Sequence, residues 1–450
     1  MKLVIIGAGK VGETLVENLI GEDHDVVVVD TNHEKVSYIV NRYDVQGVVG
    51  SGLDREALLN AEVDRADFII TCTSRDEMNI LCCVLARKMG AKNTIARVRD
   101  PEYFQGMENV REDLGVDFFF NPELQAAVEI AEVVKFPSAK NVENFAGGKV
   151  NMVELDIEEG NPLVGKSLMQ ISKEYGAKIL FGIVNRGGET IIPRGDFVLL
   201  AGDSVNVIGV EQEVANFSKK LKIFKPRAKT VFIVGGGKIA YYLADKLIKG
   251  GVSVKIVEKD KARAETLSKD LPSATIILGD GTEQEILDEE NLKESDACIT
   301  LTGMDEENVI ISFYAQSKGV GKVITKVDRP SVLEMVKKLG LSTVVSPRVC
   351  IANHIIRFVR AHQAESGAGI NTLYKLHDKV EALEFTVDSS FGGEGVPLKN
   401  LQLKRSVLLG GIVRGDEFIL PNGESCLLRG DKVIVVAPAR QINELSEILG

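Results

Sequence analysis

Two glycine-rich segments hold the residues of this chain whose types and spacing could do chemistry. The first reads Gly7-Ala8-Gly9-Lys10-Val11-Gly12, and the second reads Gly235-Gly236-Gly237-Lys238-Ile239-Ala240. In the pattern Gly-x-Gly-x-x-Gly/Ala the first glycine makes a tight turn, the second admits a pyrophosphate, and the third position lets a helix approach a strand. A helix that begins at Lys10 or Lys238 would direct its free amides and positive dipole end at that anion. The two segments therefore predict two phosphate-binding sites.

An acidic residue follows each glycine segment at the distance expected for a nucleotide ribose. Asp30 lies 23 residues after Gly7, and Glu258 lies 23 residues after Gly235, each at the end of an apolar run. A carboxylate there accepts hydrogen bonds from the ribose hydroxyls and repels a 2′-phosphate. This favours NAD(H) or an adenosine nucleotide over NADP. The alternative is that both residues are acidic helix N-caps.

Further small and polar residues recur in both halves of the chain at nearly constant spacing. In a doubly wound sheet they would fall at the carboxyl ends of successive strands, where ligands bind. The predicted set comprises Ser51, Gly52, Asp280 and Gly281 beside an adenine, Thr73, Ser74 and Thr302 near the pyrophosphate, and Arg97 and Lys326 within reach of a phosphate or ribose. Each residue taken singly could instead be an ordinary turn residue.

The elements that must position these residues form four parts. Residues 1–123 and 229–347 alternate short apolar strands with helical patterns, as a βαβ series does. Residues 142–226 and 367–450 contain short Val/Ile runs with Gly, Pro and Asp turns, and the last part lacks the region that corresponds to 172–176. We predict an α/β chain with two Rossmann-like doubly wound domains, each followed by a small α+β domain, in a tandem duplication.

Two amphipathic segments, about 124–136 and 348–361, join the four parts. An exposed apolar face on either segment would serve self-association of the chain. The alternative is packing between the parts of one chain. Tandem copies usually pack one half on the other with pseudo-symmetry.

Composition narrows the class of function. A content of 44% hydrophobic and 26% charged residues, with no apolar run near the ~18 residues of a spanning helix and no signal-peptide pattern, predicts a soluble cytoplasmic protein. A net charge of −11 without a basic stripe disfavours a nucleic-acid partner. The six cysteines lack metal-ligand spacing, so we expect reduced core thiols and no metal. Redox sensing by Cys72 is the alternative.

No catalytic residue is predicted. A dehydrogenase needs a proton donor or acceptor that faces the nicotinamide, and the histidines lie away from the glycine segments and strand ends. They are His24, His33, His354, His362 and His377. We expect His354 to be a packing residue on its helix. An NAD-dependent oxidoreductase with a duplicated cofactor domain remains the alternative to a nucleotide sensor, and the acidic charge disfavours a redox-sensing transcription regulator.

The order of Rossmann domain, small domain, Rossmann domain and small domain over essentially the whole chain resembles the TrkA family, whose members are tandem RCK (KTN) regulatory subunits of Trk potassium uptake systems. Within the first small domain the resemblance is carried by residues 161–168, residues 192–196 and Gly202-Asp203. It implies a peripheral subunit on the cytoplasmic face of the membrane, a homo-oligomeric ring of dimers. That ring would gate a Trk-type potassium channel in response to NAD(H) or ATP/ADP. Because Ala240 replaces Gly12 and Lys326 replaces Arg97, the two sites could prefer different nucleotides.

Overall fold

The fold was analysed in a computed structural model, which describes all residues except 23, 224–225, 342, 363–369 and 377–378. The expected start of the last domain at residue 367 and the histidine at 377 lie outside the described residues.

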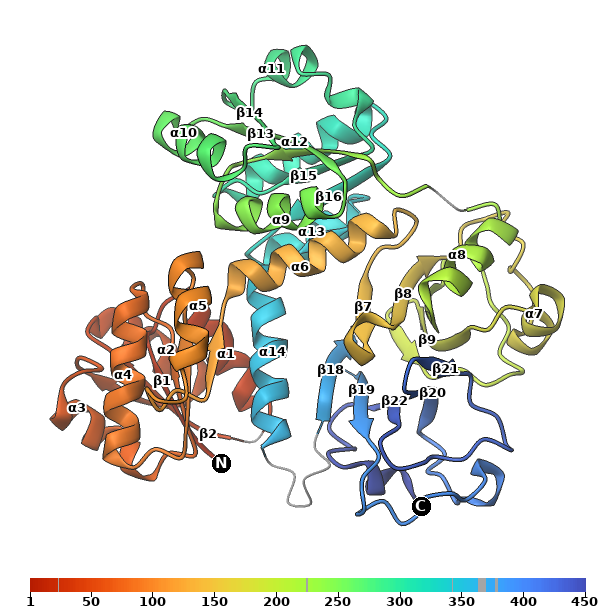
Figure 1. The fold of residues 1–450 in the computed structure, drawn as a ribbon, viewed down its shortest axis with the longest axis horizontal. Coiled ribbons are helices and arrows are strands. Elements are labelled where there is room, and N and C mark those ends of the chain that lie inside the picture. Colours follow the sequence, from red (N-terminus) through yellow and green to blue (C-terminus); the bar gives the residue numbers. More distant parts are fainter. Residues whose placement is uncertain (23, 224–225, 342, 363–369, 377–378) are drawn as a thin grey trace.

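The first Rossmann domain is a parallel sheet in the order β3-β2-β1-β4-β5-β6 with helices on both faces (Figure 1). Its elements are β1 (Lys2–Ile6), α1 (Lys10–Ile20), β2 (Asp25–Asp30), α2 (His33–Tyr43), β3 (Gln46–Val49), α3 (Arg55–Asn60), β4 (Phe68–Thr71), α4 (Asp76–Met89), β5 (Asn93–Arg97), α5 (Pro101–Met107) and β6 (Phe118–Phe120). The central strands are continuous apolar runs because both faces of the sheet are covered. The strand order reverses at β1, which places a ligand crevice beside the end of that strand.

The second Rossmann domain repeats this topology in the order β14-β13-β12-β15-β16-β17. Its elements are β12 (Thr230–Val234), α9 (Lys238–Lys249), β13 (Ser253–Glu258), α10 (Lys261–Asp270), β14 (Thr275–Leu278), α11 (Gln284–Glu289), β15 (Ala297–Thr300), α12 (Asp305–Ser317), β16 (Lys322–Lys326), α13 (Pro330–Lys338) and β17 (Val344–Val345). Helices α1 and α9 both begin directly after a glycine N-cap, as the glycine segments predict.

Each Rossmann domain is followed by a small antiparallel module. The first small module comprises β7 (Val142–Phe145), β8 (Val150–Asp156), α7 (Leu168–Tyr175), β9 (Leu180–Arg186), β10 (Glu189–Ile191), β11 (Ser204–Gly209) and α8 (Glu211–Lys220). The second comprises β18 (Ile370–Leu376), β19 (Val380–Thr386), β20 (Leu408–Arg414), β21 (Glu417–Ile419) and β22 (Lys432–Pro438). Both sheets share one strand order, and a 3₁₀ turn at Leu398–Asn400 replaces α7 in the second module.

The two small modules pack against each other through one face of each sheet. Met152, Ile183 and Ile208 of the first module form a single buried cluster with Ala382 and Ile434 of the second. The modules therefore bring the two halves of the chain together with the pseudo-symmetry that a tandem duplication predicts.

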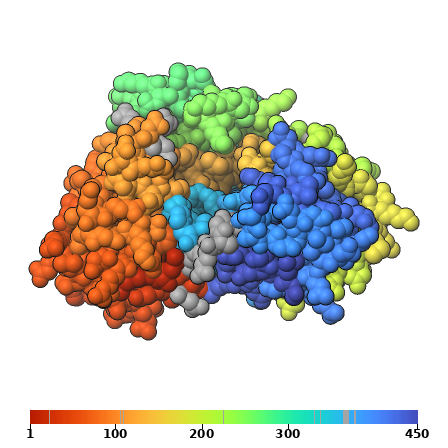
Figure 2. Space-filling model, turned by 60° about the horizontal axis from the view of Figure 1, so that its bottom comes forward, coloured from red at the N-terminus to blue at the C-terminus, as the bar shows by residue number. Residues whose placement is uncertain are grey.

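The helices that leave the Rossmann domains are exchanged between the halves. Helix α6 (Pro122–Lys135) follows the first Rossmann domain, yet Ala127 and Ile130 are buried in one core with Leu243 of α9. Helix α14 (Pro347–Ala361) follows the second Rossmann domain, yet Ile355 is buried with Leu15 of α1. The two helices also contact each other, and α14 lies recessed between the first Rossmann domain and the second small module (Figure 2). Both amphipathic segments thus bury their apolar faces within one chain.

His354 on α14 is a packing residue, as the sequence predicts. Its ring stacks on Phe118 with centroids 5.3 Å apart. Burial, reinforced by the charge of Arg357, lowers the pKa of His354 to about 3. The imidazole is therefore neutral at physiological pH and lies in the helix interface.

A buried ionic cluster connects α14 to both of its neighbours. Arg360 donates from Nε to Glu22 Oε2 at 2.6 Å and from Nη1 to Glu381 Oε2 at 2.8 Å, and Lys375 Nζ lies 2.6 Å from Glu22 Oε1. The side chains of Arg360, Glu22 and Glu381 are at most 4% exposed. Burial alone would raise the pKa of Glu22, but the hydrogen bond from Lys375 and the charge of Arg360 outweigh it and lower that pKa. The cluster joins the first Rossmann domain, α14 and the second small module.

Replacing the central cation of this cluster should destabilise the protein. In Arg360→Met, Glu22 and Glu381 keep their burial and lose their shared partner, which typically costs about 3–5 kcal/mol. We expect a clear drop in the midpoint of urea unfolding followed by circular dichroism. Arg405, which is exposed on the second small module, supplies the matched control Arg405→Met, and equal midpoints for the two variants would contradict the assignment.

Candidate nucleotide sites

The glycines after β1 have three different surroundings. Gly7 has φ +117°, and a Cβ there would lie 2.9 Å from the backbone carbon of Cys72. A Cβ on Gly12 would lie 1.9 Å from the Gly7 oxygen, whereas a Cβ on Gly9 would meet nothing within 4 Å. Gly7 thus makes the turn, Gly12 permits close packing of helix and strand, and Gly9 borders open space at the N-terminus of α1. That open space is the cradle that a pyrophosphate requires.

The second half repeats this geometry. Gly235 has φ +99°, and a Cβ there would lie 2.8 Å from the backbone carbon of Leu301. A Cβ on Gly237 would meet nothing within 4 Å. Two equivalent cradles therefore stand at the ends of β1 and β12.

Asp30 and Glu258 face these cradles from the ends of β2 and β13. Asp30 Oδ2 accepts from the Ala8 amide at 2.7 Å, and Glu258 Oε2 accepts from the Gly236 amide at 2.7 Å. Neither is a helix N-cap, since that position belongs to Asn32 for α2 and to Asp260 for α10. The N-cap alternative is therefore wrong, and each carboxylate is held beside a glycine segment where a ribose would lie.

A buried asparagine, which the sequence interpretation did not single out, shapes the loop after each fourth strand. The Asn79 side chain in α4 accepts from the Thr73 amide at 2.8 Å and donates to the Arg97 carbonyl at 2.9 Å. Asn308 in α12 makes the matching bonds, at 2.8 Å to the Thr302 amide and 3.1 Å to the Lys326 carbonyl. Each side-chain amide ties together the ends of two adjacent strands. The presence of an asparagine at the same position in both halves of the sequence could have indicated this role.

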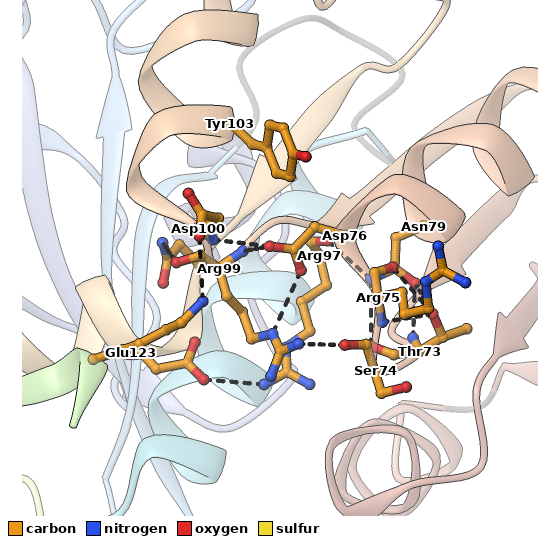
Figure 3. Close-up of polar contacts among 12 residues, drawn as sticks. Thr73, Ser74, Arg75, Asp76, Asn79, Arg97, Arg99, Asp100, Tyr103 and Glu123 are labelled. Carbon is orange, nitrogen blue, oxygen red and sulfur yellow. Dashed lines mark hydrogen bonds and ion pairs between the residues drawn. The ribbon is translucent and has the colours of Figure 1, made fainter. Parts of the chain in front are cut away.

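Arg97 of β5 and Glu123 of α6 form a partly satisfied ion pair at the first site. Arg97 Nη2 lies 3.2 Å from Glu123 Oε1, and the two side chains are 13% and 19% exposed (Figure 3). Arg97 Nε and Glu123 Oε2 are buried and have no hydrogen-bond partner among the described residues. Unpaired buried polar atoms are costly, so this pair suits a polar ligand. In the second half, Lys326 Nζ lies 3.0 Å from Asp328 Oδ2 and 3.3 Å from the Thr302 carbonyl.

A second acidic anchor orders the segment after β5. Asp76 Oδ2 accepts from the amides of Arg99 and Asp100, both at 2.8 Å, and the Arg99 guanidinium also contacts the Ser74 carbonyl (Figure 3). Asp305 accepts from the amides of Asp328 and Arg329 in the same way. These bonds hold the Arg99 and Lys326 loops against the cradles.

The predicted residues converge on two cavities. The first site, of about 690 Å³, includes Gly7, Gly9, Lys10, Val11, Asp30, Ser51, Gly52, Thr73, Ser74 and Arg97. The second site, of about 600 Å³, includes Gly235, Gly236, Gly237, Lys238, Ile239, Glu258, Asp280, Gly281, Thr302 and Lys326. Both volumes lie in the range of small-molecule sites. Of the predicted set, only Ala8 and Gly12 do not line their cavity, because they are buried beneath it.

The two sites are neighbours. Arg99, Glu123, Ile239 and Lys326 line both cavities. Tyr242 of α9 strengthens this junction, because its hydroxyl accepts from Asn121 at 2.9 Å and donates to the Arg99 carbonyl at 3.0 Å. Each site is therefore completed by residues from the other half of the chain.

Cys72 lies at the first site as a buried thiol. Its Sγ is 3.3 Å from the Gly7 carbonyl oxygen, and burial raises the pKa of the thiol to about 12. A thiol that stays protonated at neutral pH is a poor nucleophile, which disfavours the redox-sensing alternative.

Family comparisons agree with this duplicated architecture. The TrkA-N domain model matches residues 3–122 and 231–347, and the TrkA-C domain model matches residues 152–222 and 383–450. The chain belongs to the TrkA family. Within this family, it is 33% identical over 450 residues to the Trk system potassium uptake protein TrkA homolog of Archaeoglobus fulgidus, with 100% of both chains covered. It is 29% identical over 441 residues to TrkA of Vibrio alginolyticus, covering 97% of this chain and 95% of that one.

Solved structures share the fold of this TrkA-family chain. The GsuK channel bound to NAD matches with a TM-score of 0.64 and 17% identity, over 97% of this chain and 77% of that one. The GsuK RCK domain matches with a TM-score of 0.63 and 16% identity, over 97% of this chain and 92% of that one. At these identities the likeness establishes the fold: two Rossmann-like RCK domains with their small modules.

A methyl group should lower the stability of the protein at Gly12 and leave it almost unchanged at Gly9. Gly12→Ala places a Cβ against the backbone oxygen of Gly7 and should lower stability by at least about 1–3 kcal/mol. Gly9→Ala enters open space, with φ −81° already allowed for any residue, and should change stability by under about 0.5 kcal/mol. Thermal unfolding of the nucleotide-free proteins measures both, and equal melting temperatures would show that the packing at Gly12 is looser than described.

Proposed function

We propose that this chain is a cytoplasmic regulatory subunit of a Trk-type potassium uptake system. It binds NAD(H) and adenosine nucleotides at its two sites and controls a membrane potassium channel or transporter subunit, from a peripheral position on the inner face of the membrane, as a homo-oligomer such as a ring of dimers. The observation that carries the proposal is the pair of phosphate cradles, each with a ribose carboxylate, in a chain whose full-length relatives are named potassium uptake proteins.

The chemistry of the two sites supports nucleotide binding. Gly9 and Gly237 leave room for phosphates at the N-termini of α1 and α9. The carboxylates of Asp30 and Glu258 lie beside these glycines and can accept hydrogen bonds from ribose hydroxyls. Solved structures of this fold include GsuK bound to NAD and GsuK bound to ADP. When bound, the nucleotide supplies anionic phosphates and ribose hydroxyls, and the side chains of this protein supply their complements.

The exchanged helices provide the link from the sites to the rest of the molecule. Glu123 at the start of α6 lines both cavities, and Arg348 at the start of α14 lines the first. The far ends of these helices adjoin the small modules. A nucleotide that binds one arrangement of these helices better than another shifts the population toward it, by an amount set by its differential affinity. Binding energy is in this way converted into a change of shape that a membrane partner can sense.

We infer that the nucleotides act as signals without turnover. The lining of the two sites, over the described residues, contains no histidine or tyrosine, and Lys326, which lines both cavities, is bonded to Asp328 and to the Thr302 carbonyl. The alternative hypothesis, an oxidoreductase, requires that the protein consume NADH with some small substrate, which a spectrophotometric assay of NADH would reveal.

The described part of the chain contains no helix with the length and apolarity needed to cross a bilayer.

An aspartate at the second glycine of each segment should close one site at a time. Asp is favoured at helix N-caps, so Gly9→Asp and Gly237→Asp should preserve α1 and α9 while placing a carboxylate where a phosphate must lie. Isothermal titration calorimetry with NADH and with ATP should then show loss of one class of site in each variant and of all binding in the double variant. Unchanged binding in the double variant would refute the assignment of both cradles.

Potassium uptake tests the cellular role. Cells deleted for this gene should lose rapid uptake from micromolar external potassium, and the wild-type chain should restore it. We expect the chain with both Gly9→Asp and Gly237→Asp to accumulate normally and yet to fail to give nucleotide-dependent uptake. Uptake that is indifferent to the presence of the chain would reject the proposed function.

A further inference from the structure

We infer that the two sites are specialised, the first for an adenosine di- or triphosphate and the second for NAD(H). The inference rests on the proposed function and names the ligand class of each site. Both sites have the same glycine cradle and a ribose carboxylate, so the difference between them arises from the side chains around that common frame.

Charge is the main difference. Seven cationic and three anionic side chains line the first site, whereas four cationic and four anionic side chains line the second. Asp280 of the second site stands where the first has Ser51, and it accepts from the Thr282 amide and hydroxyl at 2.9 and 2.7 Å. These hydrogen bonds lower the pKa of Asp280 and keep it ionised. A ligand with many phosphate charges is therefore favoured in the first site, whose lining has a net positive charge, over the second, whose lining charges balance.

Asp280 and Ser51 lie at the adenine end of the ligand, and the strand order places further differences at its distal end. In both sheets the strand that carries the ribose carboxylate lies on one side of the phosphate cradle, and the loop after the fourth strand lies on the other. When the adenosine lies on the side of the ribose carboxylate, the remainder of the nucleotide extends over the loop after the fourth strand. Residues at the start of α4 and α12 thus meet either a terminal phosphate or a nicotinamide.

Two matched positions at that end have opposite character. Arg75 before α4 corresponds to Met304 before α12, and both have φ −121° and ψ 123°, so the backbone presents the two side chains alike. Met78 in the first turn of α4 corresponds to Glu307 in α12, and all four residues line their cavities. A terminal phosphate meets a guanidinium in the first site. In the second site a thioether and a carboxylate suit an uncharged or cationic nicotinamide ring.

The exchanged helices α6 and α14 bring side chains of opposite charge to a third matched position. Each begins with a proline followed by a charged residue, which is Arg348 in α14 and Glu123 in α6. Arg348 reaches the first site from the other half of the chain and makes no hydrogen bond or ion pair with any described residue. The first turn of α14 borders the first site, since Pro347 also lines that cavity, and its N-cap Ser346 makes no side-chain hydrogen bond to the helix amides. The corresponding residue that α6 brings to the second site is the carboxylate Glu123.

Single-site variants of the full chain separate the two preferences. Gly237→Asp leaves only the first site open, and Gly9→Asp leaves only the second. By calorimetry at low salt we expect the first site to bind ATP at least about tenfold more tightly than NADH, and the second to bind NADH at least about tenfold more tightly than ATP. The ATP preference of the first site should weaken as salt increases, because screening acts on the extra phosphate charges.

Arg348→Ala tests the contribution of the other half. In the Gly237→Asp background it should weaken ATP about tenfold, the loss of one charge-assisted hydrogen bond, and should change NADH affinity by less than about twofold. Arg405→Ala, which removes an equal charge far from both sites, should change neither. In the Gly9→Asp background, Met304→Arg should raise the ATP affinity of the second site.

Two results would overturn the inference. Equal affinities of ATP and NADH in each single-site variant would show that the charge difference does not select ligands, and a reversed preference would show that the distal loops are assigned to the wrong ligand. Both results leave nucleotide binding intact. Loss of all binding in both single-site variants would instead count against the proposed function itself.

Discussion

Burial of α6 and α14 against the opposite Rossmann domain is the interaction on which the rest of this structure depends. Ile355 is inserted into a core that belongs mainly to the other half, and Ile130 into a core that both halves build together, and each fully buried aliphatic side chain contributes about 1.5–3 kcal/mol. Separated halves would expose both apolar stripes to water. The duplicated chain is therefore a single cooperative unit in which neither Rossmann domain completes its own surface, although each contains all the strands of its sheet.

The same exchange builds the ligand sites. The helices begin beside the glycine cradles, so the first residues after their prolines, Glu123 and Arg348, become part of cavities whose main walls come from the parallel sheets. In the proposed sites, local geometry would supply the phosphate and ribose contacts, while the helix exchange adds Arg348 and Glu123 to the side chains by which the two cavities differ. A position that is equivalent in the sequence repeat can thus differ in function, because each helix delivers its side chain to the partner half.

The sequence was most informative where function needs a local backbone shape. The turn at Gly7, the open cradle at Gly9 and the carboxylate of Asp30 follow from short-range spacing, and the repetition of the pattern separates it from a chance match. Helix exchange could not be predicted, since an amphipathic pattern shows that α14 has an apolar face without showing which surface covers it. The structural role of Asn79 could not be predicted from its local sequence, because a polar residue in the first turn of a helix is usually solvated, and only the tertiary structure buries it against two strand ends.

The ionic cluster around Arg360 is present in only one of the two matching junctions between a Rossmann domain and the small module of the other half, as far as the described residues show. At the corresponding places in the other half, the chain has Gly250 where Glu22 stands and Asn151 where Glu381 stands, so the described residues there cannot form the same cluster. The first small module and the second Rossmann domain also border a cavity of about 580 Å³ lined by Ala139, Asp156 and Lys322 among others, and neither Gly250 nor Asn151 lines it. The two halves of the duplicated chain are therefore joined by different chemistry: buried charges hold the first Rossmann domain to the second small module, and an uncharged glycine and asparagine stand at the matching positions of the other junction.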